Sequence, residues 1–153
     1  MSIRLLIADD YDAMRENIKS FVSKQPDIEV VGEAKDGETA VELARNLSPD
    51  LVLMDISMPK LSGIEAAKNI LSNNAAARII IVSTRSDKRF VEAGLKAGVL
   101  GYVLKTSIFD DLIPAVRAVM ANEFFLSPQI TDVEIGDYTK QPPPKADDSV
   151  SGT

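Results

Sequence analysis

The chain has 153 residues, a formal net charge of −6 and a sequence pI of about 4.7, which fits one domain with an extension. It contains no cysteine and no histidine, which excludes disulfide frameworks, thiolate and histidine catalysis, and Cys- or His-based zinc sites. The acidic balance offers no basic footprint for nucleic acid, so we expect no direct DNA binding by this chain. No signal peptide or membrane span is visible in the sequence, and we expect a soluble cytoplasmic protein.

Short apolar runs alternate with stretches of helical periodicity. In chain order, we expect a strand at 3–8, a helix at 12–24, a strand at 28–31, a helix capped by Asp36 and ended before Pro49, a strand at 51–54, a helix through 64–71, a strand at 79–82, a helix at 87–97, a strand at 100–104 and a helix at 109–121. This alternation predicts an α/β domain with a doubly wound, five-stranded parallel sheet and five helices. The strands are mostly apolar runs, which is typical of a sheet covered on both faces.

The pattern ends near the C-terminus. After Leu126 no periodicity continues, and residues 140–153 read KQPPPKADDSVSGT. Three consecutive prolines cannot join a helix or a central strand. We therefore expect the folded domain at residues 1–125 and a linker or disordered tail at residues 126–153.

Polar residues stand at the ends of four of the expected strands. Asp9 and Asp10 close the first strand, Asp55 the third, Ser83 the fourth and Lys105 the fifth. Ligands in doubly wound sheets gather at the carboxyl ends of the strands. If these strands are neighbours, three mutually repelling carboxylates meet a hydroxyl and an ammonium group. Such an oxygen-rich pocket suits Mg²⁺ and a phosphoryl group, with a carboxylate as the nucleophile.

These residues lie within a set of motifs that resembles a known family. The set comprises the acidic pair Asp9-Asp10, LVLMDISMPKLSG around Asp55, IIIVST with Ser83, and KAGVLGYVLK ending at Lys105. Together they resemble the CheY-like response-regulator receiver domain of two-component systems, over about residues 1–125. Each motif is weak by itself, whereas the ordered set is specific. The resemblance implies a flavodoxin-like strand order 2-1-3-4-5.

The resemblance also implies a role for each matching residue. Asp55 corresponds to the phosphoacceptor, Asp10 to a direct metal ligand, and Asp9 to a neighbour acting mainly through metal-bound water. The backbone carbonyl of Ser57 corresponds to the third protein ligand of Mg²⁺, and Lys105 to the phosphate-binding lysine. The protein would then be no enzyme in the ordinary sense, but a phosphoacceptor switch that assists its own phosphorylation and dephosphorylation.

Two further residues correspond to the switch of the family. Ser83 matches the switch hydroxyl, where threonine is more frequent, and Tyr102 matches the switch aromatic residue. Thr84 would take the place of Ser83 if the strand register differs by one residue. Thr106 follows the lysine where many receivers have proline.

Partners follow from the same resemblance: a sensor histidine kinase, and a homodimer formed on phosphorylation. The phrase GYVLKTS, with FFLSPQI downstream, is similar to the NarL/FixJ subfamily, whose LuxR-type output domains bind DNA through a helix-turn-helix. Transcription would then be controlled by a domain outside these 153 residues. Two alternatives stay open. A haloacid-dehalogenase-type phosphohydrolase also uses a strand-end aspartate, but it needs an acid at the position that Ser57 occupies. A pure interaction module would keep the fold without accepting phosphate.

Overall fold

The computed structural model describes residues 2–133, and residues 1 and 134–153 lie outside the described part. The strands are β1 (Ile3–Ala8), β2 (Ile28–Ala34), β3 (Leu51–Met54), β4 (Ile79–Ser83), β5 (Gly101–Leu104) and β6 (Phe125–Leu126). The helices are α1 (Asp12–Val22), α2 (Gly37–Leu47), α3 (Gly63–Asn73), α4 (Lys88–Ala97) and α5 (Ile108–Met120), with a single 3-10 turn at Lys105–Ser107 before α5. The predicted alternation of strands and helices is confirmed.

The sheet is parallel throughout and has the order β2-β1-β3-β4-β5-β6. The doubly wound order of the first five strands agrees with the prediction, but the expected number of strands is wrong. A sixth strand, β6, pairs with β5, with Gly101 opposite Phe125 and Tyr102 opposite Leu126. Two residues are too few to show a period of two in the sequence, so pairing with β5 rather than the local pattern defines this strand.

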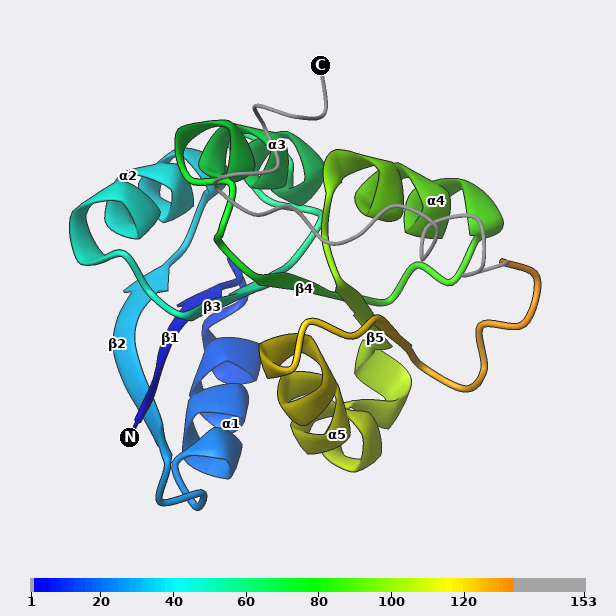
Figure 1. The fold of residues 1–153 in the computed structure, drawn as a ribbon, viewed down its shortest axis with the longest axis horizontal. Coiled ribbons are helices and arrows are strands. Elements are labelled where there is room, and N and C mark those ends of the chain that lie inside the picture. The colour runs from blue at the N-terminus through cyan, green and yellow to red at the C-terminus, as the bar shows by residue number, and fades with distance from the viewer. Residues whose placement is uncertain (1, 134–153) are drawn as a thin grey trace.

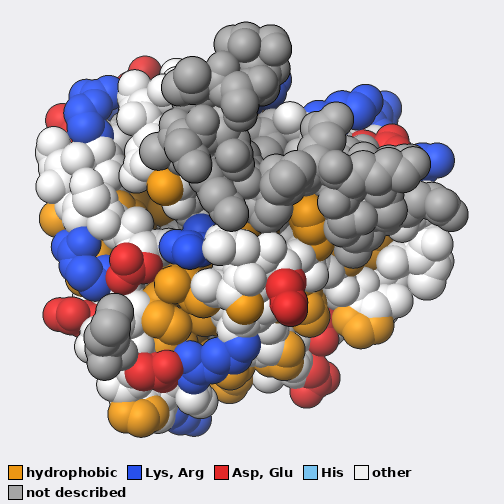
Figure 2. Space-filling view, in the orientation of Figure 1, with side chains coloured by type: hydrophobic (Ala, Val, Ile, Leu, Met, Phe, Trp, Pro, Cys, Tyr) orange, Lys and Arg blue, Asp and Glu red, His pale blue; other side chains and the backbone are white. Residues whose placement is uncertain are grey.

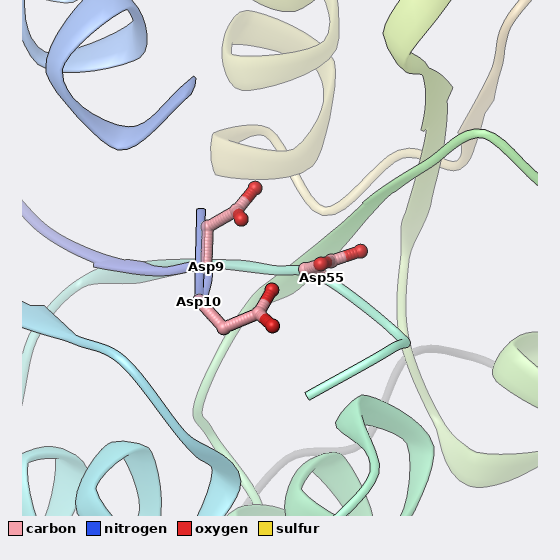
Figure 3. Close-up of side chains that lie close together, drawn as sticks. All are labelled: Asp9, Asp10 and Asp55. Carbon is pink, nitrogen blue, oxygen red and sulfur yellow. The ribbon is translucent and has the colours of Figure 1, made fainter. Parts of the chain in front are cut away.

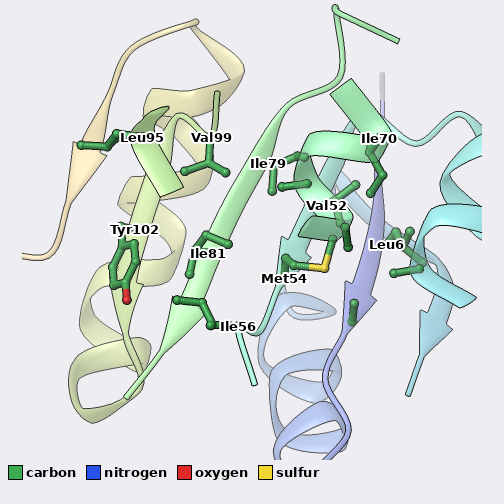
Figure 4. Close-up of a cluster of buried hydrophobic side chains, with 14 of the residues drawn as sticks. Leu6, Val52, Met54, Ile56, Ile70, Ile79, Ile81, Leu95, Val99 and Tyr102 are labelled. Carbon is green, nitrogen blue, oxygen red and sulfur yellow. The ribbon is translucent and has the colours of Figure 1, made fainter. Parts of the chain in front are cut away.

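Helices cover both faces of the sheet (Figure 1). Helices α2, α3 and α4 lie on one face, and α1 and α5 lie on the other. Strands β3 and β5, which have neighbours on both sides, are continuously apolar because their alternate side chains enter two separate cores. Strand β2, which has only one neighbour, carries Glu29 and Glu33. Figure 4 shows the core beneath α3 and α4, which includes Leu6, Val52, Met54, Ile56, Ile70, Ile79, Ile81, Leu95, Val99 and Tyr102.

Local sequence explains where several helices begin. Asp36 is the N-cap of α2, as predicted: its carboxylate accepts a hydrogen bond of 2.7 Å from the backbone N–H of Thr39. The hydroxyl of Ser62 caps α3 in the same way through the N–H of Glu65, at 3.2 Å. Helix α1 ends two residues earlier than predicted, at Val22, because the chain turns before Pro26.

Gly63 allows α3 to begin against the end of β3. A Cβ atom at this position would lie 1.9 Å from the backbone oxygen of Asp55, far inside van der Waals contact. The N–H of Gly63 also donates to the carbonyl of Ile56, at 2.8 Å. Only glycine fits here, so the glycine predicted for backbone geometry fixes the loop that follows Asp55.

Among the described residues, no helix is long and apolar enough to cross a membrane. The face in Figure 2 shows Lys and Arg side chains interspersed with Asp and Glu wherever atoms are described. Among the described atoms of that face no basic patch gathers, in keeping with the net charge of −6.

Candidate functional site

The acidic residues meet because β1 and β3 end side by side. Ala8 lies opposite Met54 in the β1–β3 ladder, and the N–H of Asp55 extends that ladder by donating to the carbonyl of Ala8, at 2.9 Å. The N–H of Asp9 donates to the carbonyl of Ala34 on β2, at 3.0 Å. The strand ends therefore place the two carboxylates at one edge of the sheet.

Asp9, Asp10 and Asp55 form a cluster that we call the acidic triad (Figure 3). One carboxylate oxygen from each lies within 4.8 Å of the others, a spacing that could hold a metal ion. Asp9 and Asp55 are buried, whereas Asp10 is exposed. Hard oxygen ligands of this kind suit Mg²⁺ or another hard divalent cation.

Lys105 reaches the triad from the turn after β5. Its Nζ lies 3.0 Å from Oδ2 of Asp9 and 3.5 Å from Oδ2 of Asp55, and its side chain is largely buried. The four side chains carry three negative charges and one positive charge. One ammonium group therefore leaves excess negative charge in a partly desolvated pocket.

The pKa of Asp55 is raised mainly by burial, and the neighbouring charges also act on it. Burial raises it from 3.8 to about 6; Lys105 opposes that rise, while the charges of Asp9 and Asp10 add to it. A hydrogen bond from the N–H of Ser57, which is exposed in the bend after β3, lowers the pKa. Asp55 is thus an acid whose charged form is held at a cost, as is typical of reactive carboxylates.

The hydroxyls of Ser83 and Tyr102 meet at the backbone of one residue, Arg85. Oγ of Ser83, at the end of β4, accepts a 3.0 Å hydrogen bond from the N–H of Arg85. The hydroxyl of Tyr102, on β5, donates to the carbonyl of Arg85 at 2.5 Å. Tyr102 is fully buried, and burial raises its pKa to about 12 against the opposing hydrogen bond to Ser83. The described structure therefore holds Tyr102 inward, next to the fourth strand.

The structure brings Asp9, Asp10, Asp55 and Lys105 into one cluster and places Ser83 at the end of the neighbouring strand, as the sequence predicted. Thr84 is exposed, whereas Ser83 is buried, and this favours Ser83 over the alternative register.

Sequence reasoning missed one residue beneath the acidic pair. Arg15 on α1 is buried, and its guanidinium donates to the carbonyl of Asp9 at 2.8 Å and to Glu33 on β2 at 3.0 Å. The third guanidinium nitrogen donates to Asp12 at 2.7 Å. The available signal was its spacing, since Arg15 shares the buried face of α1 with Ile18 and Val22.

Relatives of this chain are numerous among response regulators. A family model described as "Response regulator receiver domain" matches residues 5–117. The chain is 36% identical to the transcriptional regulatory protein DegU of Brevibacillus brevis, over 90% of this chain and 58% of DegU. It is 38% identical to the nitrate/nitrite response regulator protein NarL of Escherichia coli K12, over 84% of this chain and 60% of NarL.

The solved structures that match this chain are also response regulators. A LuxR-family two-component response regulator from Aurantimonas sp. SI85-9A1 matches with a TM-score of 0.83 and 33% identity, over 92% of this chain and all of that one. The receiver domain of a NarL-type regulator from Mycobacterium tuberculosis matches with a TM-score of 0.76 and 30% identity, over 80% of this chain and 98% of that one. The chain spans about three fifths of the two curated relatives. It belongs to the response-regulator receiver domain family of two-component systems.

Proposed function

We propose that Asp55 accepts a phosphoryl group from a sensor histidine kinase in a Mg²⁺-dependent reaction, and that this modification switches a protein-interaction face. The observation that carries the proposal is the acidic triad with Lys105 at 3.0 and 3.5 Å from two of its carboxylates. Three oxygens for a cation and one ammonium for a phosphoryl oxygen are the parts that phosphoryl transfer requires.

The metal ligands fit an all-oxygen site. Asp10, which is exposed, and Asp55 would bind Mg²⁺ directly, Asp9 mainly through metal-bound water, and Ser57 through its backbone carbonyl. Mg²⁺ would supply charge neutralisation at the phosphoryl oxygens. Lys105 pairs with Asp9 at 3.0 Å, so this buried carboxylate has a partner in the absence of a cation.

Asp55 is the group suited to nucleophilic attack. With a pKa of about 6 it is ionised at neutral pH yet more basic than an ordinary aspartate. One of its oxygens would form the new bond to phosphorus as the bond between phosphorus and the kinase's histidine nitrogen breaks. Lys105 would pair with the transferred group, and the hydroxyl of Ser83 would donate to a second phosphoryl oxygen.

The proposal is tested with acetyl phosphate and Mg²⁺, followed by intact mass. The parent should gain one phosphoryl group, and Asp55→Asn should gain none. Asp27→Asn is the matched control, because Asp27 is only partly buried and pairs with Arg117 away from the triad; it should label like the parent. Labelling of Asp55→Asn at the parental rate would overturn the assignment of the acceptor. Turnover of small phosphate esters without a stable label would instead favour the phosphohydrolase.

The switch would pass through Arg85. A phosphoryl group that draws the hydroxyl of Ser83 toward Asp55 must weaken the bond that Ser83 accepts from Arg85. That same residue holds the hydroxyl of Tyr102, so the face formed by α4, β5 and α5 would respond. A coupling on the order of 1–3 kcal/mol is expected, and this face could then support a homodimer.

Two variants should separate acceptance from transmission. Ser83→Ala should still accept phosphate but transmit it poorly, and Lys105→Ala should keep the acceptor and lose transmission. Self-association and amide exchange across residues 87–120, with and without beryllofluoride, measure the transmission. Unchanged exchange with Asp55 demonstrably occupied would rule out this route.

Control of transcription is the proposed output, because the curated relative DegU is named a transcriptional regulatory protein, and both DegU and NarL are longer than the matched region. A helix-turn-helix in the ~60 residues that follow in the natural gene product would support it. A gene product ending at Thr153 would favour a stand-alone regulator that acts through protein contacts.

A further inference from the structure

A buried hydrogen-bond network ties the segment after α5 to the turn that carries Lys105. We call it the Ser127 latch; it consists of Ser127, Asp111 and Ser107. Ser127 is fully buried, and Asp111 is 8% exposed. Ser127 lies outside the region that the family model matches, residues 5–117, and the proposed function gives it no role.

Ser127 continues the β5–β6 ladder through one backbone hydrogen bond and one side-chain hydrogen bond. Its N–H donates to the carbonyl of Tyr102 at 3.0 Å, as the next step of the β5–β6 ladder. Its Oγ then accepts from the N–H of Leu104 at 2.9 Å, where the ladder would otherwise lack an acceptor. Its own carbonyl accepts from the N–H of Ile130, which turns the chain away.

Asp111 fixes this hydroxyl in place. Oδ2 of Asp111 accepts from Oγ of Ser127 at 2.7 Å and from Oγ of Ser107 at 2.6 Å. Since Ser127 Oγ accepts one hydrogen bond and donates its single proton to a carboxylate, its orientation is determined. Bonds to a buried, charged acceptor are short and strong.

The latch lies on both sides of Lys105 in sequence. Leu104, which it holds, precedes Lys105, and Ser107, which it also holds, ends the 3-10 turn that begins at Lys105. We propose that Ser127 and Asp111 are positioning residues for Lys105, so that the segment after α5 determines how firmly Lys105 holds Asp9 and Asp55.

This proposal predicts an effect on cation binding. The ammonium group of Lys105 pairs with the carboxylates of Asp9 and Asp55, and a divalent cation held by the triad would draw on the same carboxylates, so the two cations would compete for them. A rigid turn favours the ammonium group, because little backbone freedom is lost when it binds. Breaking the latch should loosen the turn, weaken the ammonium group as a competitor and make the triad bind Mg²⁺ more tightly. A merely structural defect would weaken Mg²⁺ binding or leave it unchanged.

The test uses the full chain, without phosphorylation, and compares the parent with Ser127→Ala. Amide exchange at residues 103–107 should accelerate about tenfold or more. Mg²⁺ affinity, measured by calorimetric titration, should rise about threefold, which is less than the 10–100-fold by which residues that orient direct ligands alter metal affinity. Ile70→Val, a small truncation in the core beneath α3, is the matched control and should change neither quantity. If Ser127→Ala does not fold, Ser107→Ala removes one of the two donors to Asp111 and undergoes the same two measurements.

Three results would overturn the proposal: parental exchange at residues 103–107, faster exchange with parental Mg²⁺ affinity, or faster exchange with weaker affinity. The inference depends on the proposed function only for the cation. If no variant bound Mg²⁺, the metal step of the proposed function would fail, and the exchange at Leu104 would still decide whether the latch holds the turn.

Discussion

The strands begin at one side of the sheet, which we call the amino edge, and end at the other, the carboxyl edge. The pKa of an aspartate is lowered at the amino edge and raised at the carboxyl edge. At the amino edge, Asp27 precedes β2 and forms a bidentate ion pair with Arg117, at 2.6 and 3.0 Å. Both side chains of this pair are partly exposed to solvent. That partner lowers the pKa of Asp27. At the carboxyl edge, Asp55 is buried beside two other carboxylates and one ammonium group, and its pKa rises to about 6. The charge of Asp27 is thus compensated by one partner, whereas the charge of Asp55 is buried with incomplete compensation, and such a carboxylate is a candidate functional group.

The largest expected effect concerns the cation. Asp10→Ala should lower Mg²⁺ affinity about a hundredfold, because loss of a direct ligand should equal or exceed the 10–100-fold effect of outer-shell partners. Asp9→Ala should lower it less, and Asp27→Ala should leave it at the parental value. Calorimetric titration measures all three. Equal affinity in Asp10→Ala and the parent would remove the functional distinction between the two edges.

The next effect is on stability without Mg²⁺. Between about pH 4 and 6, native Asp55 binds more protons than the unfolded chain does, because its pKa is raised in the fold. The parent therefore loses stability as the pH rises through this window, by an amount on the order of 1–3 kcal/mol. Asp55→Asn has no such loss and should be more stable than the parent above about pH 6.

Denaturant unfolding at pH 4 and pH 7 tests this prediction. The advantage of Asp55→Asn should be small at pH 4 and complete at pH 7, and added Mg²⁺ should reduce it by stabilising the parent. An advantage of equal size at both pH values would mean that burial of the charge is not its source.

A smaller effect of opposite sign is expected at the amino edge. The lowered pKa of Asp27 means that its contribution to stability is present above its unfolded pKa and is lost as the pH falls through the folded value. Asp27→Asn should therefore unfold slightly more easily than the parent at pH 7, by less than Asp55→Asn gains, since exposed pairs contribute little. Thermal melts of the two variants, run side by side, provide the comparison.

The smallest effect is expected for the tail. Residues 140–153, which lie outside the described part, are rich in proline and polar residues, and their composition predicts little burial. Deleting them should leave the thermal midpoint nearly unchanged. A clear drop would show that the tail packs on the domain.

The sequence predicted the acidic triad because each of its members follows an apolar run, and parallel strands bring their ends together. It did not predict β6, because Phe125 and Leu126 show no periodicity of their own. The Ser127 latch was invisible for a different reason. The hydrogen-bond partners of Ser127 lie 16 and 23 residues away in the sequence, at Asp111 and Leu104. The only sign of its burial in the sequence was the apolar run that directly precedes it, at 124–126. Arg15 was missed because charged residues on helices usually face solvent.

Gly63 has a consequence for the direction in which the pocket can yield. There is no room for a Cβ atom between the start of α3 and the carbonyl of Asp55, so the wall of the pocket that carries Asp55 is closely packed and cannot move inward. The opposite wall is held by side-chain hydroxyls at Arg85 and by the latch at Leu104, both of which can exchange partners without unfolding a strand. The wall that carries Asp55 is therefore rigid, and the wall formed by the ends of β4 and β5 is the one that can move. We therefore expect a change at Asp55 to move β4 and β5 rather than α3.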